Sequence, residues 1–339
     1  VGIVPAIVLS LKENDISNEY YVNDLNNQHK DIKQLKAEKE ELIAKQISIK
    51  ETIISLKENL EVLEKTINFG LYPQTIKDKS VSIITSIPND DGYYLGNDGN
   101  YYAKLIANPH SKGKTYYFSN NEEIIIGKEY YFKVEPIVFE RLHGNKDFYL
   151  SQKIIDTMVY QDEYYKEDNK YYVKSGISGN NYEYSKVRKV LNSVFLNKAF
   201  SIEEQANLEK TYVDNSPKST GLIENAYASK DTCDYVFLPS VEEMTLSSNG
   251  FKNEKEKDNK RIKETTDYAK ANGAYLPDNM RQNYFLRSPN DWLTSFVRTV
   301  SYAGDIVSGN DFSYTHNGVA VAIVLKNVNK WFLIRITCF

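Results

Sequence analysis

Residues 290–316, NDWLTSFVRTVSYAGDIVSGNDFSYTH, carry the side chains best suited to chemistry. Asn, Asp, Ser, Thr, Tyr, Trp and Phe crowd this segment, separated by small or aliphatic residues. Rigid aromatic side chains provide contact area at low entropic cost, and short polar side chains provide adaptable hydrogen bonds, so this composition is typical of binding loops. We predict a ligand-facing surface that consists of Asn290, Asp291, Trp292, Tyr302, Asp305, Asn310, Asp311, Phe312, Tyr314 and His316.

The same segment also has a purely structural interpretation. An ordinary polar loop region can use its aromatic residues to cover the core, and Trp292 and Phe312 fit this alternative best. Val297 and Val300 are expected to form the framework beneath the loops. Arg287, just before the segment, is expected to anchor it through hydrogen bonds rather than to contact a ligand.

Patterns for catalysis and for metal binding are weak. The four histidines are scattered, and Cys233 and Cys338 provide neither a disulfide framework nor a metal cluster. The acidic residues at 89–98 miss the spacing of an EF-hand loop, so a hairpin turn is a better interpretation than a calcium site. No nucleophile and base stand at a spacing that indicates convergence. We therefore predict no catalytic residue, no cofactor and no metal.

Charge and hydropathy exclude two kinds of partner. The chain has 339 residues, with 42 basic and 46 acidic side chains and a net charge of -4, and Lys and Arg dominate no stretch alone. A nucleic acid partner is therefore not expected. The longest apolar run, residues 1–11, is about half as long as a bilayer requires, so this segment is expected to hold no membrane span.

A heptad repeat runs through residues 24–68 without Gly or Pro in its helical part. Of eleven positions at alternating steps of three and four, Lys39 and Gln46 are polar and nine are apolar, namely Ile32, Leu35, Leu42, Ile49, Ile53, Leu56, Leu60, Leu63 and Ile67. This pattern predicts a coiled-coil helix of about 45 residues, which self-associates as a dimer or trimer and which Gly70 caps at its end. The alternative is a single amphipathic helix that folds back on the globular part.

The remaining chain has the composition of an α+β domain, which we place at residues 69–326 and which an apolar tail, residues 327–339, follows. The stretch 92–104 predicts a β-hairpin, and strands are expected at residues 130–142 and 148–151. Apolar spacing predicts a helix over residues 184–195, and TTDYAKANG predicts another that ends at Gly273. Ser201 with Glu204 and Ser240 with Glu243 fit capping boxes. The charged stretch 251–261 is expected to be solvated and mobile.

Eight phrases, in order, resemble a bacterial and phage family catalogued as a domain of unknown function (six-two-seven-three). They are FGLYPQT (69–75), YYFKVEPIVFERL (130–142), YSKVRKVLN (184–192), AFSIEEQANLEKTYVDNS (199–216), DYVFLPSVEE (234–243), TDYAKANGAY (266–275), NYFLRSP (283–289) and NGVAVAIVL (317–325). The resemblance implies a C-type-lectin-like fold and a variable, ligand-facing surface near residues 290–316, which in this family is sometimes diversified by a reverse transcriptase of a retroelement.

Two departures from the family pattern bear on the site. Ala320 and Val321 replace an Arg-Pro pair, and Tyr284 and Phe285 replace a double Trp. Contacts that depend on the missing Arg are therefore not expected here. The resemblance also implies a distant relation to formylglycine-generating oxidases, which depend on a pair of cysteines. No equivalent pair is present in this sequence, so we predict that the protein is not an enzyme.

The opening phrase VGIVPAIVL resembles the closing phrase NGVAVAIVL, and its Pro5 fits the family's closing phrase better. We therefore expect residues 1–20 to be the closing strand of a preceding repeat or, alternatively, an N-terminal strand of the same domain. Taken together, the sequence predicts an extracellular, cell-surface or virion-borne adhesion protein that binds a glycan or protein. The alternative is a structural repeat subunit of a filament, stalk or phage tail.

Overall fold

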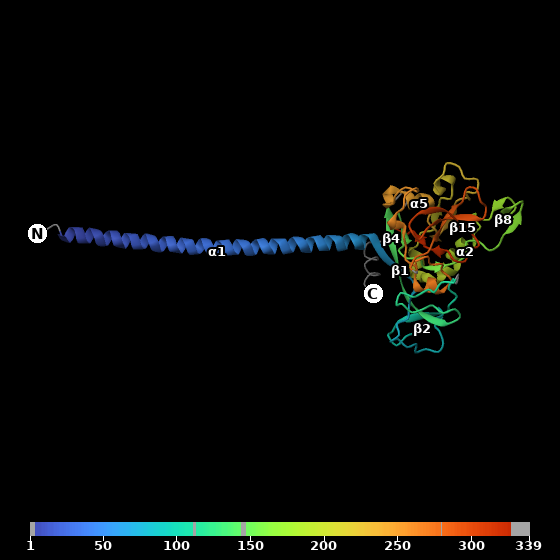
Figure 1. Ribbon diagram of the computed structural model, residues 1–339, viewed down its shortest axis with the longest axis horizontal. Helices are drawn as coiled ribbons and strands as arrows, with labels where there is room; N and C mark the ends of the chain where they lie inside the picture. The colour runs from blue at the N-terminus through green and yellow to red at the C-terminus, as the bar shows by residue number, and fades with distance from the viewer. Residues whose placement is uncertain (1–3, 111–112, 144–146, 279, 327–339) are drawn as a thin grey trace. The chain divides into compact units, whose positions relative to one another are not determined.

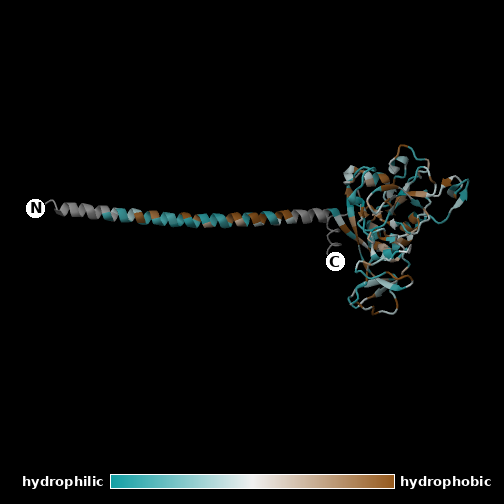
Figure 2. Cartoon of the chain, viewed as in Figure 1, coloured by the Kyte–Doolittle hydropathy of each residue, from teal (hydrophilic) through white to brown (hydrophobic). Residues whose placement is uncertain are grey.

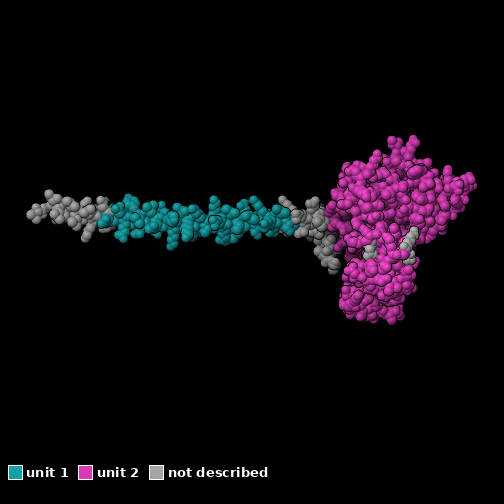
Figure 3. Space-filling model, viewed as in Figure 1, with its two compact units in different colours: residues 1–64 teal, residues 65–339 magenta. Residues whose placement is uncertain are grey.

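The computed structural model describes residues 4–110, 113–143, 147–278 and 280–326. The chain divides into two compact units, which we call the helical unit, residues 1–64, and the globular unit, residues 65–339 (Figures 1 and 3).

The helical unit consists of α1 (Val4–Lys65). The predicted strand at residues 1–20 is wrong from Val4 onward, because α1 begins there. Pro5 falls in the first turn of this helix, where its missing N–H removes no intrahelical hydrogen bond, so the residue is compatible with a helical start.

The described side chains of the heptad lie on the surface of α1. Apolar residues recur along the described part of the helix (Figure 2), and the exposed members of the heptad are Ile32, Leu35, Leu42, Ile49 and Ile53. The side chains of Leu56, Leu60 and Leu63 lie outside the described residues. The long helix is therefore confirmed, whereas its self-association stays a prediction.

The globular unit is a mixed α+β structure built around two larger sheets. The larger sheet runs in the order β12–β17–β5–β4–β3–β2, and β1 pairs with β4 in addition. Its strands are β1 (Thr66–Ile76), β2 (Tyr93–Leu95), β3 (Tyr101–Ile106), β4 (Glu129–His143), β5 (Asp147–Ser151), β12 (Val236–Phe237) and β17 (Ala322–Ile323). The predicted hairpin is confirmed in β2 and β3, and the two predicted strands are confirmed in β4 and β5.

The second sheet runs in the order β15–β14–β13–β16–β6. Its strands are β6 (Asp156–Thr157), β13 (Tyr284–Pro289), β14 (Phe296–Val300), β15 (Ile306–Asp311) and β16 (Gly318–Val319). The smaller sheets contain β7 (Tyr165–Glu167), β8 (Lys170–Lys174) and β9 (Ile177–Ser178), and the pair β10 (Thr211–Val213) and β11 (Thr232–Asp234). The closing phrase of the sequence therefore forms β16 and β17 and joins the two larger sheets.

Short helices connect these strands. They are α2 (Lys186–Val190), a π-helical turn (Leu191–Phe195), α3 (Leu196–Ala199), α4 (Ile202–Asn207), α5 (Val241–Thr245) and α6 (Asp267–Ala271), with 3₁₀ turns at Pro217–Thr220, Ser247–Asn249 and Asn259–Arg261. Both predicted capping boxes are confirmed, at the starts of α4 and α5. The two helices predicted around residues 184–195 and before Gly273 are confirmed as well.

The predicted end of the coiled coil is wrong. Ile67 belongs to β1, where it pairs with Phe139 and is buried in the core, so this residue cannot contribute to an oligomer interface. Gly70 does not cap a helix, because it lies inside β1 at a register shift with φ +70°. A Cβ atom there would approach the carbonyl oxygen of Ala199 to 2.6 Å, which explains the glycine. Burial against β4 overrides the heptad pattern here.

The prediction that the charged stretch 251–261 is solvated is wrong for Arg261, which is completely buried. Among the described residues, its guanidinium donates hydrogen bonds only to backbone carbonyls, including Met244 O at 2.8 Å and Gly304 O at 3.3 Å. Burial lowers the pKa of this group. The many charged residues of this stretch suggest exposure and give no sign of a buried arginine. A guanidinium has five N–H donors and can therefore bind several backbone carbonyls of a polar loop at once.

In the part of the chain that the structure describes, no helix combines the length and the apolar character needed to cross a membrane.

Candidate functional site

Two neighbouring strands, β14 and β15, lie within the segment predicted to bind a ligand, and β13 directly precedes it. Antiparallel pairing places Phe296 opposite Asp311 and Val300 opposite Ile306. Val297 and Val300 are completely buried, as expected of a framework beneath the loops. The loops between these strands and the chain after β15 carry most of the other side chains of the segment.

Most of the predicted ligand-facing residues reach solvent. Trp292, Tyr302 and Tyr314 have exposed fractions of 71%, 40% and 51%. Asp291 is exposed as well, and the partly exposed members of the set are Asp305, Asn310, Asp311 and His316.

Two predicted ligand-facing residues are structural instead. Phe312 is completely buried, with its ring centroid 4.7 Å from that of Tyr164 and 5.8 Å from that of Tyr171. Asn290 is buried too, and its Oδ1 accepts hydrogen bonds from the backbone N–H groups of Trp292 and Leu293. Neither side chain can reach a ligand in this structure, because one fills the core and the other closes a turn.

Two carboxylates of the segment, those of Asp305 and Asp311, accept hydrogen bonds from residues of their own turns. Asp311 Oδ1 accepts from the backbone N–H of Ser313 at 2.9 Å. Asp305 Oδ2 accepts from Ser301 Oγ at 3.2 Å and lies 3.5 Å from Lys257 Nζ. These bonds fix the loop conformation and leave the carboxylates only partly available to a ligand.

A cavity of about 230 Å³ brings three of the predicted residues together, namely Asn310, Tyr314 and His316. His110, Tyr275, Asn283 and Asn317 complete its lining. We call this cavity the amide pocket, because three asparagines contribute to its wall.

Aromatic rings form one side of the amide pocket. The ring centroids of His110 and His316 lie 3.8 Å apart, and those of His110 and Tyr275 lie 5.1 Å apart. His316 Nδ1 lies 2.9 Å from the carbonyl oxygen of Gly273, and since a carbonyl only accepts, we assign the hydrogen to Nδ1. This contact holds the His316 ring in place.

Asparagine amides also line the pocket. Asn310 Nδ2 donates to Asn317 Oδ1 at 2.7 Å, and Asn283 Oδ1 accepts from the backbone N–H of Tyr302 at 3.0 Å. Asn317 is only 5% exposed, and its buried Nδ2 has no hydrogen-bond partner among the described residues. A buried amide hydrogen without an acceptor is unfavourable, so this group is suited to bind an acceptor that a ligand supplies.

Four members of the pocket escaped prediction from the sequence. His110 and Tyr275 come from loops far from the segment, and no pattern connects them to it. Asn283 and Asn317 stand just outside the segment on either side, so a wider window could have included them.

Metal binding has no support in the described residues, where no group of three or more His, Cys, Asp or Glu side chains could hold a metal ion.

A family model with the description Domain of unknown function (DUF6273) matches residues 146–327, more than half of the chain. The chain belongs to this family. The DUF6273 match contains β13 to β17 and therefore most of the amide pocket, whereas His110 lies before it. The phrases at 69–75 and 130–142 also lie before the matched range. No curated protein and no solved structure gives a significant match.

Proposed function

We propose that the globular unit is a non-enzymatic recognition module, which binds a glycan or protein at the surface formed by residues 290–317. The amide pocket is the centre of this surface, and the unpaired Nδ2 of Asn317 is the observation that carries the proposal. A hydroxyl or carbonyl oxygen of a ligand would satisfy this group.

The lining of the pocket agrees with recognition rather than catalysis. Its aromatic rings offer flat apolar faces, and its asparagine amides offer both donors and acceptors. The rings of its two histidines contact each other, with their centroids 3.8 Å apart. A sugar ring or a short polar loop of a protein has the matching combination of apolar faces and oxygen atoms.

We further propose a C-type-lectin-like fold for this unit. The support is the mixed α+β structure, the short strands with long connections, and the resemblance of the phrases around β13 to β17. In such a fold an irregular surface carries the ligand site, which agrees with the loops before β14, between β14 and β15 and after β15 in residues 290–316.

The helical unit would raise the avidity of this module. We propose that α1 forms a coiled coil through its exposed heptad residues and so joins two or three globular units. Several weak sites on one assembly bind a surface with repeated ligands much more strongly than one site does. An extracellular, cell-surface or virion location and diversification by a retroelement would suit such a protein.

A second candidate function is assembly, in which the chain is a structural subunit of a filament, stalk or phage tail. Trp292 and its neighbour Leu293 favour this alternative, because they expose 71% and 46% of their surface side by side. Adjacent exposed apolar residues are common at contacts between proteins.

A binding screen on glycan arrays and on bacterial and animal cells tests the proposal, with the full chain and two single variants. Tyr314→Ala removes an aromatic side chain of the amide pocket, whereas Trp292→Ala removes one outside it. We expect Tyr314→Ala to weaken binding by more than about tenfold and Trp292→Ala to change it little.

Two results would contradict the proposal. If Ala at Trp292, Tyr302, Asp311 and Tyr314 together leaves binding unchanged, the surface is not the site. If Trp292→Ala alone abolishes formation of filaments seen by electron microscopy, the assembly function is the better one.

A further inference from the structure

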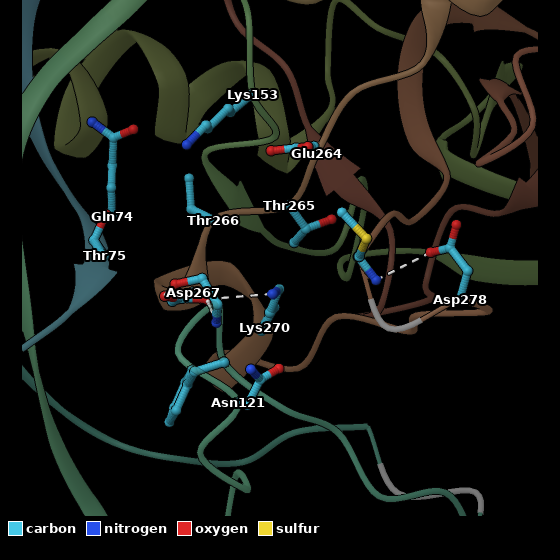
Figure 4. Close-up of a pocket in the computed structure, with 13 residues that line it drawn as sticks. Gln74, Thr75, Asn121, Lys153, Glu264, Thr265, Thr266, Asp267, Lys270 and Asp278 are labelled. Atoms are coloured by element: carbon cyan, nitrogen blue, oxygen red, sulfur yellow. Dashed lines mark hydrogen bonds and ion pairs between the residues drawn. The ribbon is translucent and has the colours of Figure 1, made fainter.

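A second cavity of about 380 Å³ lies apart from the amide pocket, between β1, the loop after Phe118 and the chain around α6 (Figure 4). We call it the α6 cavity. Polar and charged side chains dominate its lining, and they include Gln74, Lys153, Glu264, Thr265, Asp267 and Lys270.

The inner wall of the α6 cavity carries a buried ion pair, in which Lys270 Nζ lies 3.3 Å from Asp267 Oδ1. The carboxylate of Asp267 is well satisfied, because it also accepts from Ser119 N at 2.8 Å, Ser119 Oγ at 2.6 Å and Ile76 N at 3.2 Å. Its negative charge is therefore shared among several donors.

The ammonium group of Lys270 is less well satisfied. Besides the contact with Asp267, its one further bond in the described structure is to the carbonyl oxygen of Tyr117, at 3.4 Å. Both contacts are long for an ammonium, which has three hydrogens to donate. The ammonium of Lys270 therefore keeps a free capacity to donate at the inner wall.

Thr265 also lines the α6 cavity and has an unpaired hydroxyl. Its residue is 5% exposed, and Oγ1 is buried without a hydrogen-bond partner among the described residues. The neighbouring Thr266 is fully used, since its Oγ1 donates to Ile155 O and accepts from Ala269 N. Because buried hydroxyls are nearly always paired, the unpaired Oγ1 indicates a missing partner inside the cavity.

The outer part of the cavity has a different charge pattern. Lys153 and Glu264 are exposed, and Figure 4 shows them opposite Asp267 and Lys270. Gln74 Nε2 donates to the carbonyl oxygens of Glu135 and Pro136, so its Oε1 is left as an acceptor. The carboxylate of Glu264 is thus available as an acceptor near the mouth, whereas Oε1 of Gln74, a residue 7% exposed, is an acceptor deeper in the cavity.

We propose that the α6 cavity binds a free α-amino acid, with its carboxylate on Lys270 and Thr265 and its ammonium group toward Glu264 and Gln74. A zwitterion matches these donors and acceptors at the same time. A phosphate would bring two negative charges toward the carboxylates of Asp267 and Glu264, and a neutral sugar would offer no charged group to the ammonium of Lys270 or to the carboxylate of Glu264. The volume suits a small ligand with room for a side chain.

Isothermal titration calorimetry of the full chain with glycine, L-alanine, L-serine and L-glutamine tests this proposal. L-Alaninamide lacks the carboxylate, propionate lacks the ammonium group, and glucose lacks both charges. We expect at least one of the four amino acids to bind saturably, and the three control compounds to bind at least about tenfold more weakly. The absence of saturable binding by all four amino acids overturns the proposal, as does equal binding of glucose or alaninamide.

Three variants locate the binding. Thr265→Val keeps the shape of the side chain and removes a hydroxyl that has no partner, so the unliganded protein should stay folded while affinity falls about tenfold. Glu264→Gln, at an exposed position, should weaken binding of the amino acid but not of propionate. Tyr314→Ala, in the amide pocket, should have no effect. Wild-type affinity in both Thr265→Val and Glu264→Gln would show that the cavity is not the site.

Discussion

Arg287 and Glu243 form a two-point ion pair inside the globular unit, with Nη1 2.6 Å from Oε2 and Nη2 2.8 Å from Oε1. Arg287 is 2% exposed and also donates to the carbonyl oxygens of Leu238 and Asp214. Glu243 in turn accepts from the backbone N–H of Ser240 at the start of α5. The pair therefore joins β13 to α5 directly before the ligand-facing segment begins.

Glu243→Gln should destabilise the protein strongly, because it leaves the guanidinium of Arg287 buried without a counter-charge. We expect a loss of about 3 to 5 kcal/mol in the free energy of unfolding, measured by urea denaturation. Glu242→Gln is the matched control, since Glu242 pairs with Lys218 at the surface and its loss should cost under about 1 kcal/mol. Similar losses in the two variants would show that the buried pair contributes little.

Lys263 gives the stability of the protein a specific pH dependence. Burial lowers the pKa of its ammonium group to about 8, and its Nζ donates to the carbonyl oxygen of Ser151 at 2.6 Å. An unfolded lysine titrates near pH 10.4, so between these values the unfolded chain binds more protons and stability rises with pH. Below pH 8 the lysine is protonated in both states, and the penalty for burying its charge is constant.

Lys263→Met should remove this rise. Relative to the variant, the wild-type protein should gain about 2 kcal/mol in free energy of unfolding between pH 7 and pH 9.5, measured by urea denaturation. Taking the difference between the two proteins cancels the titration of other groups. Lys189→Met, at an exposed lysine, serves as the control and should follow the wild-type curve. Parallel curves for Lys263→Met and wild type would contradict the assignment.

Local features of the sequence were sufficient for much of the fold. The capping boxes that begin at Ser201 and Ser240 and the hairpin at 92–104 were predicted correctly, because each depends on a few neighbouring residues. The α+β class followed from the irregular order of such elements. The long helix followed from a heptad, which is also a local pattern.

Contacts between distant segments explain what the sequence could not predict. Ile67 continues the heptad, yet it belongs to β1 because it packs against β4, more than seventy residues later. Phe312 stands among polar residues, yet Tyr164 and Tyr171 enclose it. The amide pocket requires His110 beside His316, and nothing in either local sequence indicates that they meet. Such pairings depend on tertiary packing, which overrides local preference.

Gly309 is required by the pairing of β14 with β15. Its φ is +110°, and a Cβ atom there would lie 1.7 Å from the carbonyl oxygen of Val297. Gly309→Ala should therefore cost roughly 3 kcal/mol or more, from the unfavourable φ and from the clash with a backbone atom. Gly99→Ala is the matched control, because Gly99 has φ +79° but nothing within 4 Å of its Cβ position. It should cost roughly 1 to 2 kcal/mol.

Thermal unfolding compares these two glycine variants with the wild-type protein. A lower melting temperature for Gly309→Ala than for Gly99→Ala is the expected result. Equal melting temperatures would mean that β14 and β15 can separate at this position without loss.

Substitutions at two isoleucines of α1 test the predicted coiled coil. Ile49 occupies a d position of the heptad and Ile47 a b position, and their exposed fractions in the single chain are 60% and 53%. If the heptad seam mediates association, Ile49→Lys buries a charge in it and should shift the full chain toward monomer, whereas Ile47→Lys should stay a dimer or trimer like the wild type. Size-exclusion chromatography with light scattering over a range of micromolar concentrations measures this. A wild-type chain that is monomeric throughout would contradict the coiled coil and favour a helix that folds back on the globular unit.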